Sequence, residues 1–494
     1  MNQSNTMIIF GLYLSLMLII GELCARYKIK TLDDYLVAGR RHGILITSST
    51  IAATVIGAGS TIGAVGTAYY VGISAAWYLI SACIGLILLA FTFAPTLRRM
   101  SLYTIPEFIG VRFGIKARIV ATALGFTGSI LFLGTQFYAM GVLVSQLMDL
   151  SLKLSIMLSG LVVIAYTWRG GGWAVNLSDS IQIIWIAIGL AMACFLGINM
   201  TGGLSQLTIP PIARGFEEMG RSWFNPISNQ PVDGWNIFAL GNTIMGWIIM
   251  STTWHFAMQS TAQRILSSRT HRTAKYGCLV ASGILIPLAI FMGLTGMTAR
   301  ILYPDLLPAL GISQGEALPA LIKGILSPLM GGIILGALVA IIMSTCDSIL
   351  LGASTMFVKD IYQRLLRPTV VNHTLIRLSK WVTLIIGIVA IISALMAPAL
   401  IRMLEITATV YCVALFIPII LGLYWKKANQ SGAIAAMITS SLGGILWRAS
   451  GWEKITGIHI LNFSLPLAFM TMVMVSLIIK RDRGHWRGWL KTLT

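Results

Sequence analysis

Long apolar stretches alternate with short polar connections along the whole chain. An α-helix needs about 20 mostly apolar residues to cross the hydrocarbon core of a bilayer. Windows of that length predict thirteen membrane-spanning helices, near residues 7–25, 44–70, 74–96, 117–147, 151–168, 173–199, 236–262, 276–299, 329–357, 376–396, 400–424, 430–449 and 461–480. Two proline-rich connections, 200–235 and 300–328, are predicted to form an irregular loop and a short capping helix with turns. The pattern predicts an all-α polytopic membrane protein.

The composition agrees with this class. Of the 494 residues, 56% are hydrophobic and 10% are charged, and the mean hydropathy is +0.84, a balance that excludes a water-soluble domain. The first apolar stretch follows no basic segment and carries no small-residue cleavage pattern, so we expect a retained span rather than a signal peptide. The six cysteines are scattered singly through apolar segments, which disfavours a disulfide framework.

The basic residues are distributed unevenly between the two sides of the predicted bundle. If the N-terminus lies outside, the cytoplasmic connections hold 27 of the 35 Lys and Arg residues. This asymmetry predicts an outside N-terminus and an inside C-terminus. It also assigns the net charge of +19 to topology and contact with anionic lipid rather than to a nucleic-acid surface. We therefore expect a multi-pass protein of the plasma membrane, the inner membrane in bacteria, surrounded by lipid and without an obligate protein partner.

A polar cluster interrupts the ninth apolar stretch. Ser344, Asp347 and Ser348 stand at i, i+3 and i+4, so their side chains share one helix face. A carboxylate at the membrane centre costs roughly 2.5–3.5 kcal/mol, and we expect no basic residue within the spans to neutralise it. Asp179 in the sixth span and the backbone of 53–56 in the second lie at a similar depth. Oxygen ligands without a basic partner predict a site for a hard monovalent cation or a proton.

Closely spaced glycines mark the second span. Gly57, Gly59, Gly63 and Gly66 surround a Ser-Thr pair, and each weakens a helix by roughly 1 kcal/mol relative to alanine. One interpretation is a discontinuous helix whose freed carbonyls face a cavity. The other is close helix packing through Gly59 and Gly63. The sequence leaves both open.

Further polar residues within the spans are candidates for contact with a solute. They are Ser60, Thr61, Gln136, Trp254, His255 and Gln259. Gln136, His255 and Gln259 are explained first as polar groups satisfied inside the helix bundle and only second as pocket residues. His255 has no second His or Cys beside it, so a transition-metal site is not expected. The sequence contains no P-loop, zinc-hydrolase, serine-hydrolase or paired-cysteine motif, and we expect no enzymatic activity.

Several short motifs occur together along the chain. The connection 33–40 reads DDYLVAGR, and the segment 343–362 contains MST, DS and DIY. Further motifs are IPEF at 105–108 with Arg112-Phe113, Gly171-Gly172 leading to Asp179 and Gln182, Gln263-Arg264, GLYW at 422–425 with Ala428-Asn429, and Gly432-Ala433. Together they resemble the sodium:solute symporter family over essentially the whole chain.

The resemblance implies a fold. It is a leucine-transporter-like core of two inverted five-helix repeats within a single transporter domain, 1–494. The repeats correspond to residues 44–199 and 236–424, with one extra helix before them at 7–25 and two after them at 430–480.

The resemblance also implies sodium sites. The main site is implied at the carbonyl oxygens of Ala53, Ile56 and Ile341 and the hydroxyls of Ser344 and Thr345. Some members hold a second sodium, and the corresponding residues are Asp179, Ser344, Asp347 and Ser348. Some of those members carry serine in place of Asp347. The carboxylate therefore either strengthens a second sodium site or binds a proton.

The function that the resemblance implies is sodium-coupled symport. One or two Na⁺ ions would drive import of a small organic solute by alternating access. An amino acid, pantothenate or a monocarboxylate is expected, because Leu79 stands where sugar-carrying relatives place a carboxylate. The alternatives are a proton-coupled carrier of the same fold and a sodium/sugar symporter. A transporter-derived sensor or an intramembrane enzyme is disfavoured, because neither a soluble domain nor a catalytic motif is expected.

Overall fold

The computed structural model describes residues 3–148, 150–207, 244–303, 321, 328–396 and 407–479. Within these ranges the chain is almost entirely helical, and the β-bridge found there joins His42 to Ser268. The helices of the first half are α1 (Gln3–Tyr27), α2 (Leu32–Val37), α3 (Ile44–Val55), α4 (Ala64–Val71), α5 (Trp77–Thr92), α6 (Ala94–Arg99), α7 (Ile105–Phe113), α8 (Ile115–Met148), α9 (Leu152–Met200) and α10 (Leu204–Leu207). Those of the second half are α11 (Ile244–Ala257), α12 (Gln259–Ser267), α13 (His271–Leu302), α15 (Pro328–Met356), α16 (Asn372–Met396), α18 (Ala414–Tyr424), α19 (Gln430–Ala449), α20 (Trp452–Thr456) and α21 (Ile460–Ile478). Short helical turns are η1 (Ala38–Arg40), η2 (Gly59–Gly63), η3 (Gly72–Ala76), η6 (Phe357–Leu366) and η7 (Ala408–Val413).

The helices follow the predicted apolar stretches. Among the described residues, seven helices are long and apolar enough to cross a membrane, or up to eight if the bent pair Ile44–Val55 and Gly59–Tyr69 counts as one span. The predicted class, an all-helical membrane protein that crosses the bilayer many times, is confirmed. Parts of two predicted spans (236–243 and 400–406) lie outside the described residues, as do the connection 208–235 and most of 300–328 with its predicted capping helix.

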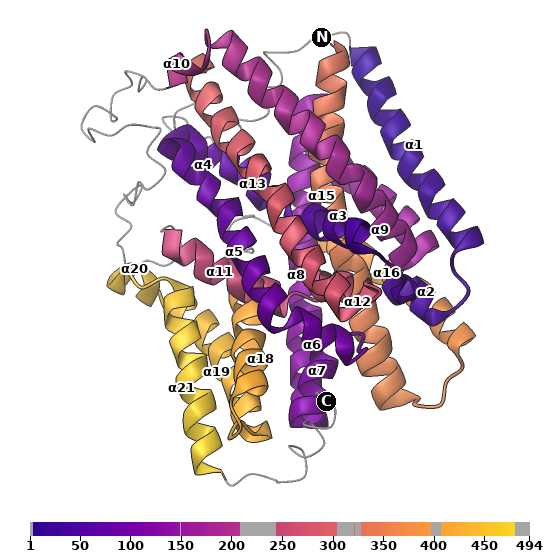
Figure 1. The fold of residues 1–494 in the computed structure, drawn as a ribbon, viewed down its shortest axis with the longest axis vertical. Helices are drawn as coiled ribbons and strands as arrows, with labels where there is room; N and C mark the ends of the chain where they lie inside the picture. The colour runs from indigo at the N-terminus through magenta and orange to yellow at the C-terminus, as the bar shows by residue number, and fades with distance from the viewer. Residues whose placement is uncertain are drawn as a thin grey trace.

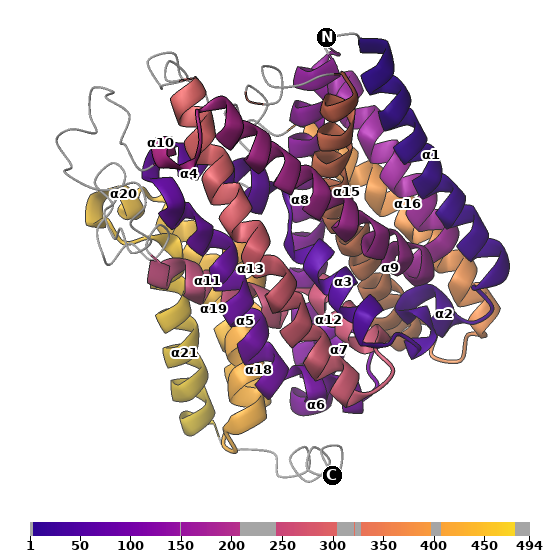
Figure 2. The ribbon, with the colours of Figure 1, turned by 45° about the horizontal axis from the view of Figure 1, so that its top comes forward.

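α15 is the central helix of the bundle. Protein buries 94% of its apolar span, against 33–61% for the other spans. α15 packs against α9, α8 and α1, with α1 at one edge of the molecule and the α19–α21 pair at another (Figures 1 and 2). Because so little of α15 reaches lipid, its polar side chains must be satisfied by other helices.

The second predicted span is broken. α3 ends at Val55, Ile56 is extended with ψ 109°, and the two halves are bent by 65°. A Cβ on Gly57 would lie 3.1 Å from Thr345 Oγ1, whereas a Cβ on Gly63 would meet nothing within 4 Å. The glycines therefore allow a break with close approach of α15, and the interpretation as a discontinuous helix is the one that the structure has.

α9 contains two predicted spans in one run of helix. Its 49 residues would measure about 74 Å if straight, more than twice a bilayer core of about 30 Å. Gly171 kinks the run with φ +49° and ψ −143°, and a Cβ there would lie 2.6 Å from the Tyr35 carbonyl oxygen. The predicted separation between 168 and 173 thus coincides with a sharp turn that requires glycine.

Candidate cation site

The break in α3 meets α15 at two hydroxyl groups. Ser344 Oγ donates to the Ala53 carbonyl oxygen at 2.9 Å, and Thr345 Oγ1 donates to the Ile56 carbonyl oxygen at 3.0 Å. Ser344 Oγ also lies 2.9 Å from the carbonyl oxygen of Ile341. The structure therefore brings together all five residues predicted for the main site, and all five are buried.

The ability of these oxygen atoms to bind a cation follows from their place at the end of α3. The last carbonyls of a helix have no intrahelical N–H partner, so those of Ala53 and Ile56 are free to accept from α15. A serine or threonine hydroxyl also carries two lone pairs and can turn them toward a cation. The set consists of oxygen atoms alone, which suits a hard cation.

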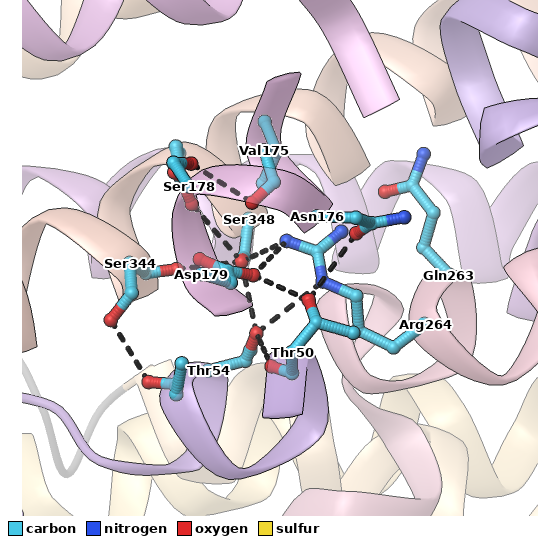
Figure 3. Close-up of polar contacts among 12 residues, drawn as sticks. Thr50, Thr54, Val175, Asn176, Ser178, Asp179, Gln263, Arg264, Ser344 and Ser348 are labelled. Atoms are coloured by element: carbon cyan, nitrogen blue, oxygen red, sulfur yellow. Dashed lines mark hydrogen bonds and ion pairs between the residues drawn. The ribbon is translucent and has the colours of Figure 1, made fainter. Parts of the chain in front are cut away.

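A second polar cluster lies one turn further along α15 (Figure 3). Ser348 Oγ is 3.0 Å from Thr54 Oγ1, and it donates to the Ser344 carbonyl oxygen at 2.6 Å. Thr50 Oγ1 donates to Asp179 Oδ2 at 2.5 Å. Hydroxyls of α3 thus link Asp179 of α9 to the polar face of α15.

This cluster contains an arginine that the sequence pattern does not predict. Arg264 Nη2 donates to Ser348 Oγ and lies 3.3 Å from Asp179 Oδ2, and the Arg264 side chain is fully buried. The expectation that no basic residue neutralises the carboxylates is wrong. The seventh predicted span breaks at Met258, which is extended (φ −69°, ψ 123°), and α12 then packs against α3 and α15. That packing turns Arg264 into the bundle instead of toward a membrane surface.

Asp347 has other partners. Tyr166 Oη of α9 donates to Asp347 Oδ2 at 2.5 Å, and Ser348 Oγ lies 3.2 Å from Asp347 Oδ1. Among the described residues, no cationic side chain lies within ion-pair distance of Asp347, which is fully buried. The predicted second-site residues are therefore neighbours, but Asp179 is paired with a cation whereas Asp347 has hydrogen bonds only.

The connection before α3 fixes the end of α12. The His42 N–H donates to the Ser267 carbonyl oxygen at 3.2 Å, and the Arg269 N–H donates to the His42 carbonyl oxygen at 2.8 Å. Burial, with a smaller contribution from the nearby Arg264 charge, lowers the pKa of His42 to about 4. His42 is consequently neutral at pH 7 and adds no charge near the cluster.

Three of the predicted solute-contact residues lie at the break itself. The Gly57 N–H donates to Ser60 Oγ at 2.8 Å, and the Ala58 N–H donates to Gln136 Oε1 at 3.2 Å. Thr61 Oγ1 donates to the Gly57 carbonyl oxygen at 2.8 Å. Ser60, Thr61 and Gln136 are therefore brought together around the start of the second half-helix.

The other three lie along α11 and α12. The Trp254 ring packs edge-to-face on Phe132 at 4.7 Å between centroids. His255 is buried with both ring nitrogens lacking a hydrogen-bond partner among the described residues. The Gln259 side chain accepts from the Ile105 N–H and donates to the Tyr103 carbonyl oxygen, both at 2.9 Å. The Gln259 side chain is thus hydrogen-bonded to the start of α7 and to the residue Tyr103 that precedes it.

Four residues of the site were not predicted from the sequence. They are Thr50, Thr54, Tyr166 and Arg264. Thr50 and Thr54 stand four apart just before the break, a spacing that signals one polar helix face. Tyr166 gives no such signal, because a tyrosine in an apolar stretch is usually a packing residue.

These features define a class of protein. A nearly all-helical membrane bundle holds a broken helix whose carbonyls meet the hydroxyls of a central helix around an oxygen-only site, and this arrangement is that of a secondary transporter. The chain belongs to the sodium:solute symporter family, whose pattern matches residues 35–440. It is a transporter and not an enzyme, and sodium is its coupling ion, as predicted.

Individual relatives agree with this assignment. The chain is 27% identical to the sodium/pantothenate symporter of Escherichia coli K12 over 90% of both chains. It is 26% identical to the high-affinity proline transporter PutP of Bacillus subtilis 168, over 93% of this chain and 95% of the relative. It is also 26% identical to the sodium/glucose cotransporter of Vibrio parahaemolyticus, over 87% and 83%. Pantothenate and proline carriers belong to the expected branch, and the three identities are too close to rank the solutes.

A solved structure has the same fold. A Na⁺-coupled sialic acid symporter in a substrate-bound, outward-open state superposes with a TM-score of 0.83 at 20% identity. The match covers 97% of this chain and 98% of that one. The likeness extends from the first helix to the last.

Proposed function

We propose that this protein imports a small organic solute together with sodium bound at the junction of α3 and α15. The ligands are the carbonyl oxygens of Ala53, Ile56 and Ile341 and the hydroxyls of Ser344 and Thr345. The observation that carries the proposal is the contact of the Ser344 and Thr345 hydroxyls with the open end of α3, at 2.9 and 3.0 Å. Sodium bound there joins the broken helix to the central helix, and its release toward the cytoplasm loosens that joint.

The domain organisation is part of the proposal. One transporter domain comprises two inverted repeats, 44–199 and 236–424, preceded by one helix at 7–25 and followed by two at 430–480, which makes thirteen spans. Two observations support it. The first span of each repeat is broken, at Ile56 and at Met258. α1 begins and α21 ends at opposite ends of the molecule, in agreement with an outside N-terminus and an inside C-terminus (Figure 1).

The solute is proposed to be an amino acid, pantothenate or a monocarboxylate, bound beside the break in α3. Leu79 is buried where a sugar carrier would need a carboxylate. The N–H groups of Gly57 and Ala58, now held by Ser60 and Gln136, are the donors that a solute carboxylate would take over. Trp254, His255 and Gln259 are the remaining residues of the proposed contact set. Of these, Gln259 lies on the side of α7.

A thermal-shift screen tests the proposal. Purified protein is melted in Na⁺ or K⁺ buffer with amino acids, monocarboxylates, pantothenate or sugars. We expect Na⁺ alone to raise the Tm and one solute class to raise it further only in Na⁺. A ligand at one hundred times its Kd stabilises a protein by about 2.7 kcal/mol.

Two results contradict the proposal. Equal melting in Na⁺ and K⁺ removes the sodium site, and a sodium-dependent shift with sugars alone selects the sodium/sugar alternative. Hits are then confirmed by sodium-dependent uptake of the labelled solute into proteoliposomes.

A further inference from the structure

A group of charged side chains lies where α1, α9 and α16 meet at one end of the bundle. Glu22 Oε1 of α1 accepts from Arg26 Nε at 2.6 Å, and Glu22 Oε2 lies 2.9 Å from Arg169 Nη2 of α9. The charges of Glu22 and Arg169 both act on Lys380 of α16. α9 packs against both α1 and α16. We call these four residues, Glu22, Arg26, Arg169 and Lys380, the rim cluster.

The rim cluster carries more positive than negative charge. Both carboxylate oxygens of Glu22 are already paired with guanidinium groups. Lys380 makes no ion pair within the part of the chain that the structure describes. Three cations around one carboxylate leave two net positive charges, and the side chains of Arg26 and Arg169 are 68% and 52% exposed. The cluster can therefore accept an anion from its surroundings without displacing an internal partner.

The rim cluster lies at the level of the lipid headgroups. Arg169 directly follows the predicted span 151–168, and Lys380 stands near the start of the predicted span 376–396. Each of these cations has a tryptophan beside it in the chain. The Arg169 guanidinium lies 5.6 Å from the centre of the Trp168 ring, and Trp381 is 56% exposed. Tryptophans gather at the interface between membrane and water, so the cations are placed where phosphates of the bilayer lie.

An apolar surface continues from the rim cluster along all three helices. Its side chains share an exposure of 38–66% and a position on the lipid-facing side of the bundle. They are Leu12, Leu16, Ile19 and Leu23 on α1, Leu154, Met157, Leu158 and Leu161 on α9, and Trp381, Ile385, Ile388 and Val389 on α16. A ligand that is anionic at one end and apolar along its length complements both parts of this surface.

The charge of the cluster selects among lipids. Guanidinium and ammonium groups both bind phosphate oxygens strongly. A zwitterionic headgroup brings its own cation, which the two net positive charges repel, whereas an anionic headgroup brings only the phosphate charge. Each Lys or Arg near the membrane surface attracts an anionic lipid by about 1 kcal/mol.

We infer that the rim cluster is a binding site for one anionic phospholipid. Lys380 and Arg169 hold its phosphate, and its acyl chains lie along α1, α9 and α16. In the proposed orientation the lipid belongs to the cytoplasmic leaflet. A lipid bound there joins three helices just before the kink of α9 at Gly171, so it stabilises the fold independently of sodium and solute.

The test compares lipids of different charge. Purified full-length protein in neutral detergent and K⁺ buffer is melted with increasing dioleoylphosphatidylglycerol. Dioleoylphosphatidylcholine is the zwitterionic reference, and inorganic phosphate supplies the anion alone. We expect phosphatidylglycerol to raise the Tm more than either reference. For Lys380→Gln, which breaks no ion pair, the lipid concentration that gives half of this rise should increase about fivefold, which corresponds to about 1 kcal/mol.

Three further variants locate the effect. Arg169→Gln removes a cation from another helix of the rim cluster and should weaken the response at least as much as Lys380→Gln. Lys380→Arg keeps the charge and should respond like the wild type. Arg367→Gln is the matched control, because it removes an exposed cation from the connection before α16, outside the cluster; its response should also equal that of the wild type.

Four results overturn the inference. They are a wild-type response to phosphatidylglycerol in Lys380→Gln, equal stabilisation by phosphatidylcholine, equal stabilisation by inorganic phosphate, which shows an adventitious ion only, and an Arg367→Gln response as weak as that of Lys380→Gln, which shows general attraction to a basic surface. Lys380→Gln decides the matter even where Arg169→Gln fails to fold. Sodium and solute are absent throughout, so none of these results bears on the proposed function.

Discussion

At the scale of single residues, the hydroxyls of Ser344 and Thr345 are hydrogen-bond donors in the structure and proposed ligands of sodium. Each now donates its proton to a carbonyl oxygen at the break in α3. Sodium at the proposed site requires the lone pairs of these hydroxyl and carbonyl oxygens to point toward the ion. The hydrogen bonds hold the proposed ligands together, which lowers the cost of ordering them on sodium binding.

Removing one of these hydroxyls should weaken sodium binding. For Thr345→Ala we expect the sodium concentration that gives half-maximal uptake to rise roughly tenfold, equivalent to about 1.4 kcal/mol for the lost ligand. Ser354→Ala is the control, because that buried hydroxyl of the same helix donates to the Ser379 carbonyl oxygen. Sodium titration of uptake measures both. Unchanged sodium dependence in Thr345→Ala would remove this residue from the site.

The sequence predicts the residues of α15 better than their partners. Ser344, Asp347 and Ser348 share a face by simple helical spacing, and the family resemblance adds Thr345. The burial of Arg264 has no such basis, because it depends on how α12 packs against α3 and α15. An arginine directly after an apolar stretch is normally at the membrane surface. Pairings across helices, such as Tyr166 with Asp347, are likewise set by packing and not by periodicity.

At the scale of elements, the glycines of the second span differ in how closely other helices approach them. Gly57 lies where the chain leaves α3, and a Cβ there would approach Thr345 Oγ1 to 3.1 Å and Gln136 Oε1 to 3.4 Å. Gly63 lies in the following turn with open space around it. The close approach of the break to α15 therefore depends on Gly57 and not on Gly63.

The two glycines form a matched pair of tests. Gly57→Ala should displace the Thr345 hydroxyl and raise the half-maximal sodium concentration by roughly threefold or more, equivalent to at least about 0.6 kcal/mol. Gly63→Ala should leave sodium dependence unchanged and raise thermal stability, by up to about 1 kcal/mol from helix propensity. Sodium titration of uptake and thermal melting distinguish them. Equal effects of the two changes on sodium dependence would contradict the assignment.

The two helix breaks differ in how visible they are in the sequence. The break at Ile56 lies beside closely spaced glycines. The sequence therefore indicated it as one of two interpretations. The break at Met258 lies between Ala257 and Gln259, with no glycine or proline to mark it. Met258 adopts an extended conformation that any residue tolerates, so only the packing of α12 against its neighbours fixes it. A pattern of hydrophobicity therefore predicts the length of this span but not its interruption.

At the scale of the whole molecule, the proposed sodium site lies deep in a bundle whose two ends face different solutions. A cation that passes from one end to the other crosses the membrane potential, which contributes about 2.3 kcal/mol per charge at 100 mV. Coupling to one Na⁺ brings a zwitterionic solute in with one net positive charge and a monoanionic solute with none, whereas coupling to two Na⁺ adds one positive charge to each. The charge of the solute and the number of coupled Na⁺ ions thus determine whether the potential drives uptake.

Proteoliposomes test this relation. For a zwitterionic solute, an inside-negative potential of 100 mV set by K⁺ and valinomycin should increase accumulation at equilibrium up to about fiftyfold, which corresponds to about 2.3 kcal/mol. For a monoanionic solute coupled to one Na⁺ the same potential should have no effect on accumulation, whereas coupling to two Na⁺ should give the increase expected of a zwitterion with one Na⁺. Initial sodium is held equal on both sides, so that only the potential drives transport. Zwitterion uptake that ignores the potential would contradict coupling to Na⁺.

The buried acidic groups of α15 and of η6, which directly follows it, have a consequence for how the protein is made. Tyr166, which donates to Asp347, lies earlier in the chain than α15, as do Thr104 and Arg118, which donate to the buried Asp360 of η6. A ribosome therefore delivers these donors to the membrane before it delivers the two carboxylates. α15 can leave the insertion machinery directly into a partly assembled bundle, and Asp347 need not wait in lipid for a partner. The order of the helices along the gene thus makes α15 a late component, whose entry depends on the helices already in place.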